Sequence, residues 1–245
     1  MIDFDDIDTV APGVGQICFY HDLNPDQPLL SIGYCRDGFW TMPVPLIAAC
    51  AVQARAAKCR LGIFGPASSE DHPAYVSIVF QTGENIRDYS LTAAENAPAA
   101  RYRFVCVVGD VVPTDMHGLS GCFIASDWNA ALAPIRLFVQ ASSLIGIDLA
   151  DAIRVMSSRV TQCETWRIDE KPSARASECE AIWLGFSNRL LLDEVHDAAR
   201  TVAATLPESV ELSFHASAET TPTMQVDAML SIACIANGQN VEAAE

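Results

Sequence analysis

The sequence predicts an α+β protein built from repeated strand–helix–strand–strand units, with antiparallel sheets and the helices gathered on one face. Similar apolar patterns start near Phe39, Phe123 and Trp183, and each combines a strand, a helix of about four turns and two or more further strands. The 245 residues are 50% hydrophobic and 19% charged, which excludes a disordered chain. Helices segregated beside antiparallel strands are typical of the α+β class.

Short apolar runs and turn residues predict the elements of the first half. Pro43 and Pro45 mark the start of a helix at about 44–58, because a first turn does not need the N–H that proline lacks. Strands are expected at 16–20, 29–35, 39–42, 59–64, 74–81, 86–91 and 102–108.

The second half repeats this rhythm. Ser126 and Asp127 are candidate N-caps for a helix that reaches about residue 141, and Pro134 must kink or break that helix. A second helix runs from about Ser187 to Leu206. Strands are expected at 122–125, 144–149, 153–161, 163–168, 181–186, 210–216 and 224–235.

A segment rich in proline and glycine, 109–118, separates two similar patterns and reads as an interdomain linker. We therefore expect an N-terminal domain at 1–108, a C-terminal domain at 119–237 and a frayed tail at 238–245.

The chain is acidic, with 15 Lys and Arg against 31 Asp and Glu and a net charge of −16. Bulk charge therefore excludes a protein that coats nucleic acid or anionic membrane. The nine cysteines lack CxxC spacing and lie mostly in apolar runs, which predicts buried free thiols and no zinc site.

The N-terminal residues are acidic and lack the basic and apolar regions of a signal peptide. The longest apolar stretch, Val44 to Val52, is too short to cross a bilayer. We expect a soluble intracellular protein, located in the cytoplasm or in the DNA-containing compartment of an infected cell.

Each expected helix has a polar face that includes cations. From the pattern alone, an ordinary solvated face with Arg189 and Asp193 as an i, i+4 ion pair is the preferred interpretation. The residues on these faces are Ala48, Ala51, Arg55 and Lys58 in the first helix, Asn129, Ala133, Arg136 and Gln140 in the second, and Arg189, Asp193, His196 and Arg200 in the third.

The order and spacing of these segments resemble the DNA polymerase sliding clamps. The run from Glu180 to Ile235 is similar to the closing unit of a clamp, and Leu144 to Glu164 resembles the hairpin that follows a clamp helix. Thr41-Met42-Pro43 is similar to the start of another clamp helix. The length resembles the clamps with two domains per subunit, which close as trimers.

The resemblance implies a ring that is not an enzyme and needs no cofactor or metal. Such a ring encircles duplex DNA, forms a homotrimer, and tethers DNA polymerase as a processivity factor after a clamp loader places it. The residues implied to face DNA are Arg55, Lys58, Arg136, Arg189, His196 and Arg200. The pocket implied for a partner peptide consists of Val111, Val112, Pro113, Leu230, Ile232 and Cys234, for which core strand packing is an equal alternative.

Two other hypotheses stay open. A Cys-dependent enzyme would use Cys122 as nucleophile with His117 nearby, although the sequence does not show that geometry. A structural or adaptor protein would use the same units without encircling DNA. The sequence contains no Walker motif, GxGxxG fingerprint, HExxH or GxSxG, which disfavours the common nucleotide enzymes and hydrolases.

Overall fold

The structure is a computed structural model, and it describes residues 4, 6, 8–21, 25–65, 73–82, 99–109, 118–139, 149–157, 159–167, 179–187, 192–217 and 225–234. Its N-terminal elements are β1 (Gln16–Tyr20), β2 (Leu30–Arg36), β3 (Phe39–Trp40), α1 (Val44–Ala56), β4 (Arg60–Phe64), β5 (Ala74–Thr82) and β6 (Ala100–Val108). The later elements are β7 (Gly121–Ala125), α3 (Trp128–Ala131), α4 (Ala133–Val139), α5 (Leu149–Met156), β8 (Arg159–Arg167), β9 (Ala181–Ser187), α6 (Leu192–Ala203), β10 (Glu211–Ser217) and β11 (Gln225–Cys234).

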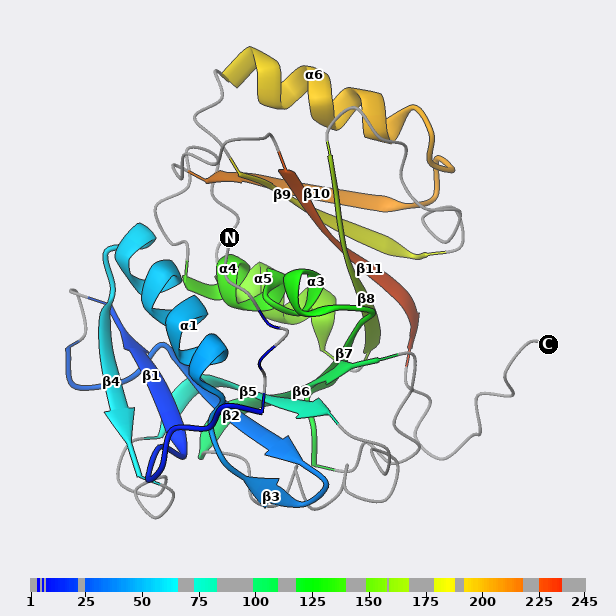
Figure 1. The fold of residues 1–245 in the computed structure, drawn as a ribbon. Helices are drawn as coiled ribbons and strands as arrows, with labels where there is room; N and C mark the ends of the chain where they lie inside the picture. The colour runs from blue at the N-terminus through cyan, green and yellow to red at the C-terminus, as the bar shows by residue number, and fades with distance from the viewer. Residues whose placement is uncertain are drawn as a thin grey trace.

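All described strands belong to one mixed sheet, ordered β10-β9-β11-β8-β7-β6-β5-β2-β1-β4, with β3 paired to β2 (Figure 1). Its centre is parallel, because β2, β5, β6, β7 and β8 pair in the same direction. The antiparallel pairs lie toward the two ends, where β1 pairs β2 and β4, and β11 pairs β8 and β9.

The predicted fold class is therefore wrong. Repeated antiparallel units would place each strand beside its neighbour in the chain through a hairpin, whereas parallel neighbours need a crossover connection. The central strands of this sheet are parallel, so the fold is mixed α/β rather than clamp-like. The error arose because an apolar run predicts a strand but not the direction in which that strand pairs.

The helices also cover both faces of the sheet rather than one. Buried residues of α1, α3 and α4 share the main core with strand residues such as Ile32, Ile78 and Phe104. On β9, Ile182 and Leu184 pack in a second core with α6, while the neighbouring Trp183 belongs to the main core. Figure 1 shows α6 on the outer side of β9 and β10, with α3, α4 and α5 beneath these strands.

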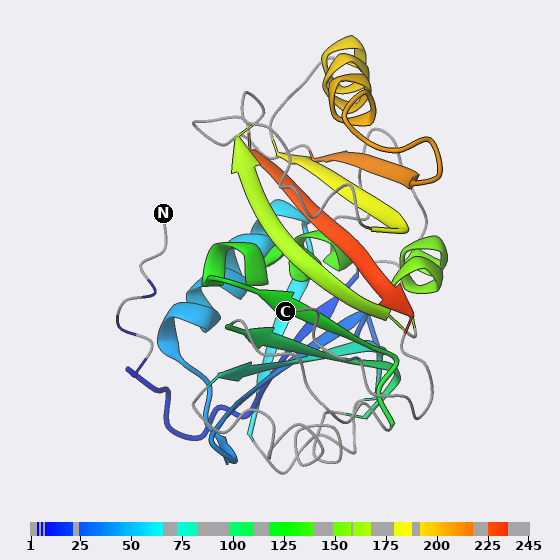
Figure 2. The same cartoon turned by 90° about the vertical axis from the view of Figure 1, so that its right-hand side faces the viewer.

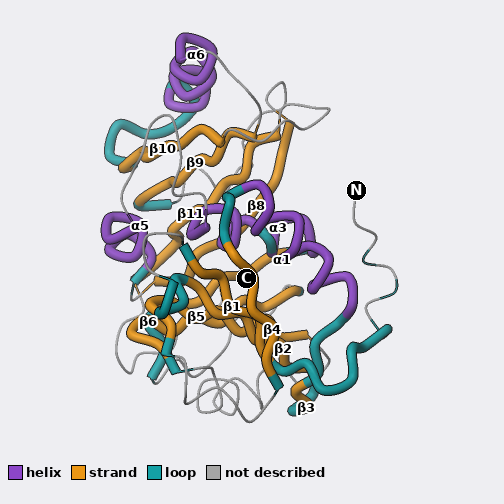
Figure 3. The backbone as a smooth tube through the Cα atoms, turned by 90° about the vertical axis from the view of Figure 1, so that its left-hand side faces the viewer, coloured by secondary structure: helices purple, strands orange, loops and turns teal. Residues whose placement is uncertain are grey.

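Two long strands connect these regions. β8 and β11 are antiparallel neighbours from Arg167 opposite Gln225 to Arg159 opposite Cys234, with a register shift between Ser231 and Ala233. Figures 2 and 3 show this pair running between the lower part of the sheet and the strands beside α6. One sheet thus includes strands from both predicted domains, and the division at 109–118 stays a prediction.

Most predicted elements form close to their expected bounds. Asp127 caps α3, since its Oδ1 accepts a hydrogen bond of 3.0 Å from the Ala130 N–H, and the helix breaks beside Pro134 as predicted. One prediction is wrong, because the chain at 153–156 continues helix α5 instead of forming a strand. The strands expected at 86–91 and 144–149 lie outside the described residues, except Leu149, which begins α5.

The prediction of free thiols is confirmed for eight cysteines. Seven of them are buried and Cys59 is half-buried, and none forms a disulfide. Within the described part of the chain, no helix has the length and apolar character that a membrane span needs.

Candidate functional site

The cations expected to face DNA do not lie together on one surface. Arg55 and Lys58 are exposed at the C-terminal end of α1, which lies beside β4 at one end of the sheet. His196 and Arg200 are exposed on α6, beside β10 at the opposite end, where a ring nitrogen of His196 lies 2.8 Å from a guanidinium nitrogen of Arg200. Arg189 lies outside the described residues.

Arg136 occupies an interior position. Only 7% of the residue is exposed, and its guanidinium donates a hydrogen bond of 2.9 Å to the Asn129 carbonyl. It therefore ties α4 to α3 and is not part of an open cationic surface. The role of these cations in facing DNA was implied only by the resemblance to clamps. Because the fold is not that of a clamp, this role has no support.

Of the six residues expected to form a partner pocket, only Leu230 has a described side chain, so the pocket itself is not tested. Leu230 on β11 is fully buried in the core beneath α6, which agrees with the alternative of strand packing. Ile232 and Cys234 also lie on β11, but their side chains are outside the description. The other three residues, Val111, Val112 and Pro113, lie outside the described residues.

Cys122 does not have the surroundings of a nucleophile. It is 1% exposed on β7, and burial raises the pKa of its thiol well above the usual range. A reactive cysteine needs exposure and a lowered pKa. The thiol is therefore protonated at neutral pH, and the structure does not support the Cys-dependent enzyme.

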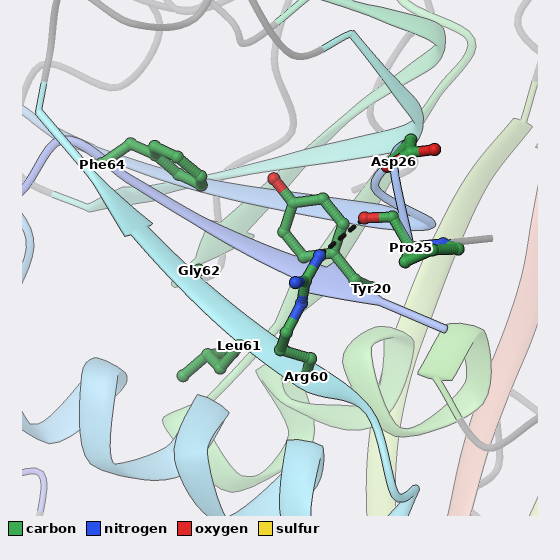
Figure 4. Close-up of a pocket in the computed structure, with 7 residues that line it drawn as sticks. All are labelled: Tyr20, Pro25, Asp26, Arg60, Leu61, Gly62 and Phe64. Atoms are coloured by element: carbon green, nitrogen blue, oxygen red, sulfur yellow. Dashed lines mark hydrogen bonds between the residues drawn. The ribbon is translucent and has the colours of Figure 1, made fainter. Parts of the chain in front are cut away.

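The structure instead reveals a shallow hollow beside β1 and β4, of about 380 Å³ (Figure 4). Register explains how these strands build it, because Arg60 pairs with Tyr20 across the ladder and Phe64 pairs with Gln16. Since side chains alternate along a strand, Arg60, Gly62 and Phe64 share one face of β4. The hollow is lined by Tyr20, Pro25, Asp26, Arg60, Leu61, Gly62 and Phe64.

Arg60 is held in position by two neighbours. Its guanidinium donates a hydrogen bond of 2.6 Å to the Pro25 carbonyl, and its Cζ lies 4.8 Å from the centre of the Tyr20 ring. A guanidinium has five N–H donors, so one bond to Pro25 leaves most of them available. Arg60 forms no ion pair with any residue that the structure describes. The hollow therefore presents an oriented cation that forms no ion pair with a described residue, and Asp26 is the one carboxylate beside it.

Gly62 makes room for the aromatic walls. A Cβ at this position would lie 2.7 Å from Cε2 of Phe64 and 3.0 Å from Cε2 of Tyr20. Real Cβ atoms essentially never come within 2.7 Å of another heavy atom, so a larger residue at this position would displace the Phe64 ring. Glycine thus lets Tyr20 and Phe64 lie over the β4 backbone, which forms the floor of the hollow.

The side chains that line the hollow favour binding over catalysis. Burial raises the pKa of Tyr20, with a smaller raising effect from Cys18, so its phenol keeps its proton at neutral pH. The lining includes no Ser, Thr, Cys or His, and Asp26 is its only carboxylate. A nucleophile with an adjacent base is therefore missing from this lining. Elsewhere in the described chain, no cluster of three or more His, Cys, Asp or Glu side chains is arranged to hold a metal ion.

The hollow lies at a free edge of the sheet. Among the described strands, β4 pairs only with β1, so its other side has no partner. Ile63, near the end of β4, is 52% exposed. Sequence reasoning found this strand but not its edge position, because edge position depends on which strands pair.

The comparisons with known proteins assign no family. No family model and no curated protein matches the chain. Among solved structures, it is similar to an FtsZ point mutant from M. jannaschii, at 13% identity over 68% of this chain and 67% of that one, with a TM-score of 0.45. An empty FtsZ dimer from M. jannaschii has 14% identity over 74% and 69% of the two chains, with a TM-score of 0.45.

A protofilament of CetZ2 from Haloferax volcanii, bound to GTPgS, gives 10% identity over 64% of this chain and 65% of that one, with a TM-score of 0.43. The mixed sheet with its parallel centre is not the antiparallel arrangement that the clamp resemblance implied. The resemblance to clamps, the function as a processivity factor, and the partnership with DNA, polymerase and loader in a homotrimeric ring are therefore wrong. At these identities and TM-scores, the FtsZ and CetZ structures transfer no ligand and no activity to this chain.

Proposed function

We propose that this chain is a binding domain that captures an acidic peptide in extended conformation along the free edge of β4. The observation that carries the proposal is Arg60, a positioned cation that forms no ion pair with a described residue and lies at a strand edge without a partner among the described strands. The chain has a net charge of −16, so such a cation is a positive site on a protein that is negative overall. The guanidinium of Arg60 can therefore form a charge-assisted hydrogen bond with a carboxylate of a binding partner.

The free edge supplies the second part of the recognition. An unpaired strand presents N–H and C=O groups that an incoming segment can pair with, and alternate side chains of that segment then meet the same face. On β4 this face consists of Arg60, Gly62 and Phe64. A peptide in which acidic and apolar residues alternate would place a carboxylate at Arg60 and an apolar group between Phe64 and Tyr20.

The binding test uses a fluorescein-labelled peptide of alternating glutamate and valine, followed by fluorescence anisotropy. We expect Arg60→Gln to weaken binding by about tenfold or more, since charge-assisted hydrogen bonds are among the stronger polar contacts. Arg154→Gln is the matched control, because Arg154 is also an exposed arginine but pairs with Asp151 and Glu211. Equal affinity of the two variants would overturn the role of Arg60.

Two further measurements separate strand pairing from simple charge attraction. A peptide with N-methyl groups on alternate residues keeps its charge but loses backbone donors, so we expect it to bind much more weakly. Gly62→Ala should also weaken binding, because the added Cβ meets Phe64 at 2.7 Å. If the methylated peptide binds as tightly as the unmodified one, β4 is not the docking strand.

A further inference from the structure

The outer face of α1 is an exposed apolar stripe. Val44, Ala48 and Val52 follow one another at i, i+4 and i+8 and are all exposed, with Val44 at 42% and Val52 at 47%. Ala51 lies half-buried beside them. Three turns of helix thus present small apolar side chains to solvent.

The opposite face of α1 is apolar as well. Leu46, Ala49 and Cys50 are buried in the main core, and Gln53 is the one polar residue buried on this face. A helix with apolar residues on both faces is normally covered on both. In the described structure α1 is covered on one side only, so its outer stripe is expected to have a partner.

The two ends of the stripe carry opposite charge. At the C-terminal end, Arg55 and Lys58 are exposed, and neither forms an ion pair with a described residue. At the N-terminal end, the Val44 N–H donates to the Thr9 carbonyl at 2.8 Å. The exposed Asp6 lies next to this bond, because its carbonyl accepts a hydrogen bond of 3.1 Å from the Thr9 N–H.

We propose that a second copy of this chain covers the stripe, with the two α1 helices antiparallel across a two-fold axis. A 13-residue helix is about 20 Å long, so reversing one copy brings its Arg55 and Lys58 to the acidic end of the other. The stripe is therefore self-complementary in charge, which is what a two-fold interface requires. Ala48 and Ala51, near its middle, allow the two helices to approach closely.

This interface is independent of the peptide site proposed above. The hollow uses the face of β4 that includes Arg60 and Phe64, whereas the α1 stripe at Val44, Ala48 and Val52 contributes no residue to its lining. Arg60→Gln should consequently leave the association of two copies unchanged. Failure of one proposal does not remove the other.

The test is the mass of the protein in solution, measured by sedimentation equilibrium over a range of concentrations. We expect a species of about twice 26.4 kDa, and we expect Ala48→Glu to return it to one chain. Phe39→Glu is the matched control, because Phe39 is 74% exposed on β3 and lies off the stripe. Circular dichroism checks that each variant is folded.

Charge exchange provides the sharper measurement. Arg55→Glu should weaken the dimer by about tenfold, and the double variant Arg55→Glu with Asp6→Arg should recover it, because each interface then regains opposite charges. A wild-type chain that stays monomeric up to the highest soluble concentration overturns the proposal. So does an assembly that persists in Ala48→Glu, or a dimer that the double variant does not recover.

Discussion

The helices α1 and α6 lie at opposite ends of the sheet and differ in the polarity of the side chains that they expose to solvent. On α6, Val195 and Ala199 are buried, while Asp193, His196 and Asp197 are exposed. This is the ordinary amphipathic pattern of a helix that covers one sheet face. On α1 the buried face is equally apolar, but the exposed face is apolar too.

The difference shows that burial in one chain does not explain every apolar residue of α1. The outer residues of α6 need no partner, since water solvates them, and its acidic first turn and Arg200 in the last turn also match the helix dipole. The outer residues of α1 would gain from leaving water, and no described part of the chain covers them. Four measurements test this contrast, and they are given in order of decreasing effect on folding stability.

The largest effect is expected where each helix packs on the sheet. Leu46→Ala removes a fully buried side chain from the main core and should cost about 2–5 kcal/mol of unfolding free energy. Val195→Ala deletes fewer atoms from the smaller core beneath α6, so we expect about 1.5–3 kcal/mol. Urea denaturation of both variants measures the difference, and an equal or larger loss for Val195→Ala would contradict this ranking of the two cores.

The second effect is a loss of stability at high pH. Burial raises the pKa of the Cys18 thiol from 9.0 to about 11, and it also raises the pKa of Cys50, on the packed face of α1, and of Cys122. A raised pKa means that the folded state holds the proton more tightly, so this stability is fully present below pH 9 and is lost as the pH rises. For Cys18 we expect a fall of up to about 1.4 kcal/mol per pH unit between pH 9 and 11. An unfolding free energy that stays flat between pH 9 and 11 would contradict it.

The third effect concerns how the helices begin. α1 starts after Pro43 without a side-chain cap, whereas α3 depends on Asp127, which accepts a hydrogen bond from the Ala130 N–H. Asp127→Ala should cost about 1 kcal/mol of unfolding free energy. Asp127→Asn is the control, since asparagine caps equally well, and we expect it to lose little. A similar loss in both variants would assign the effect to the charge of Asp127 rather than to the cap.

The smallest effect on stability is expected on the two outer faces, where it separates folding from association. Val52→Gln on α1 and Asp197→Gln on α6 should each change the unfolding free energy of the monomer by about 0.5 kcal/mol or less. Only Val52→Gln should reduce the fraction of dimer, because only the α1 stripe is expected to have a partner. A loss of dimer in Asp197→Gln would indicate an interface on α6 and contradict the one proposed on α1.

Local structure was largely predictable from the chain itself. Turn residues and apolar runs located strands such as β1 and β5, and proline chemistry located the start of α1 and the break beside Pro134. The helix at 149–156 was missed because a short apolar run does not distinguish a strand from a helix. The hollow at Arg60 was missed because its walls come from β1 and β4, which only strand pairing brings together.

Residue by residue, the chain's own chemistry therefore determines where most strands and helices form and which cysteines are buried. Only the tertiary structure decides that the central strands pair in parallel, that β4 is an edge among the described strands, and that no described segment covers one face of α1. The physical reason is that backbone propensity and apolar periodicity act over a few residues, whereas strand direction is decided by contacts between distant segments. Parallel pairing of β5 with β6 and of β6 with β7 depends on crossover connections, and an apolar strand pattern is compatible with either direction.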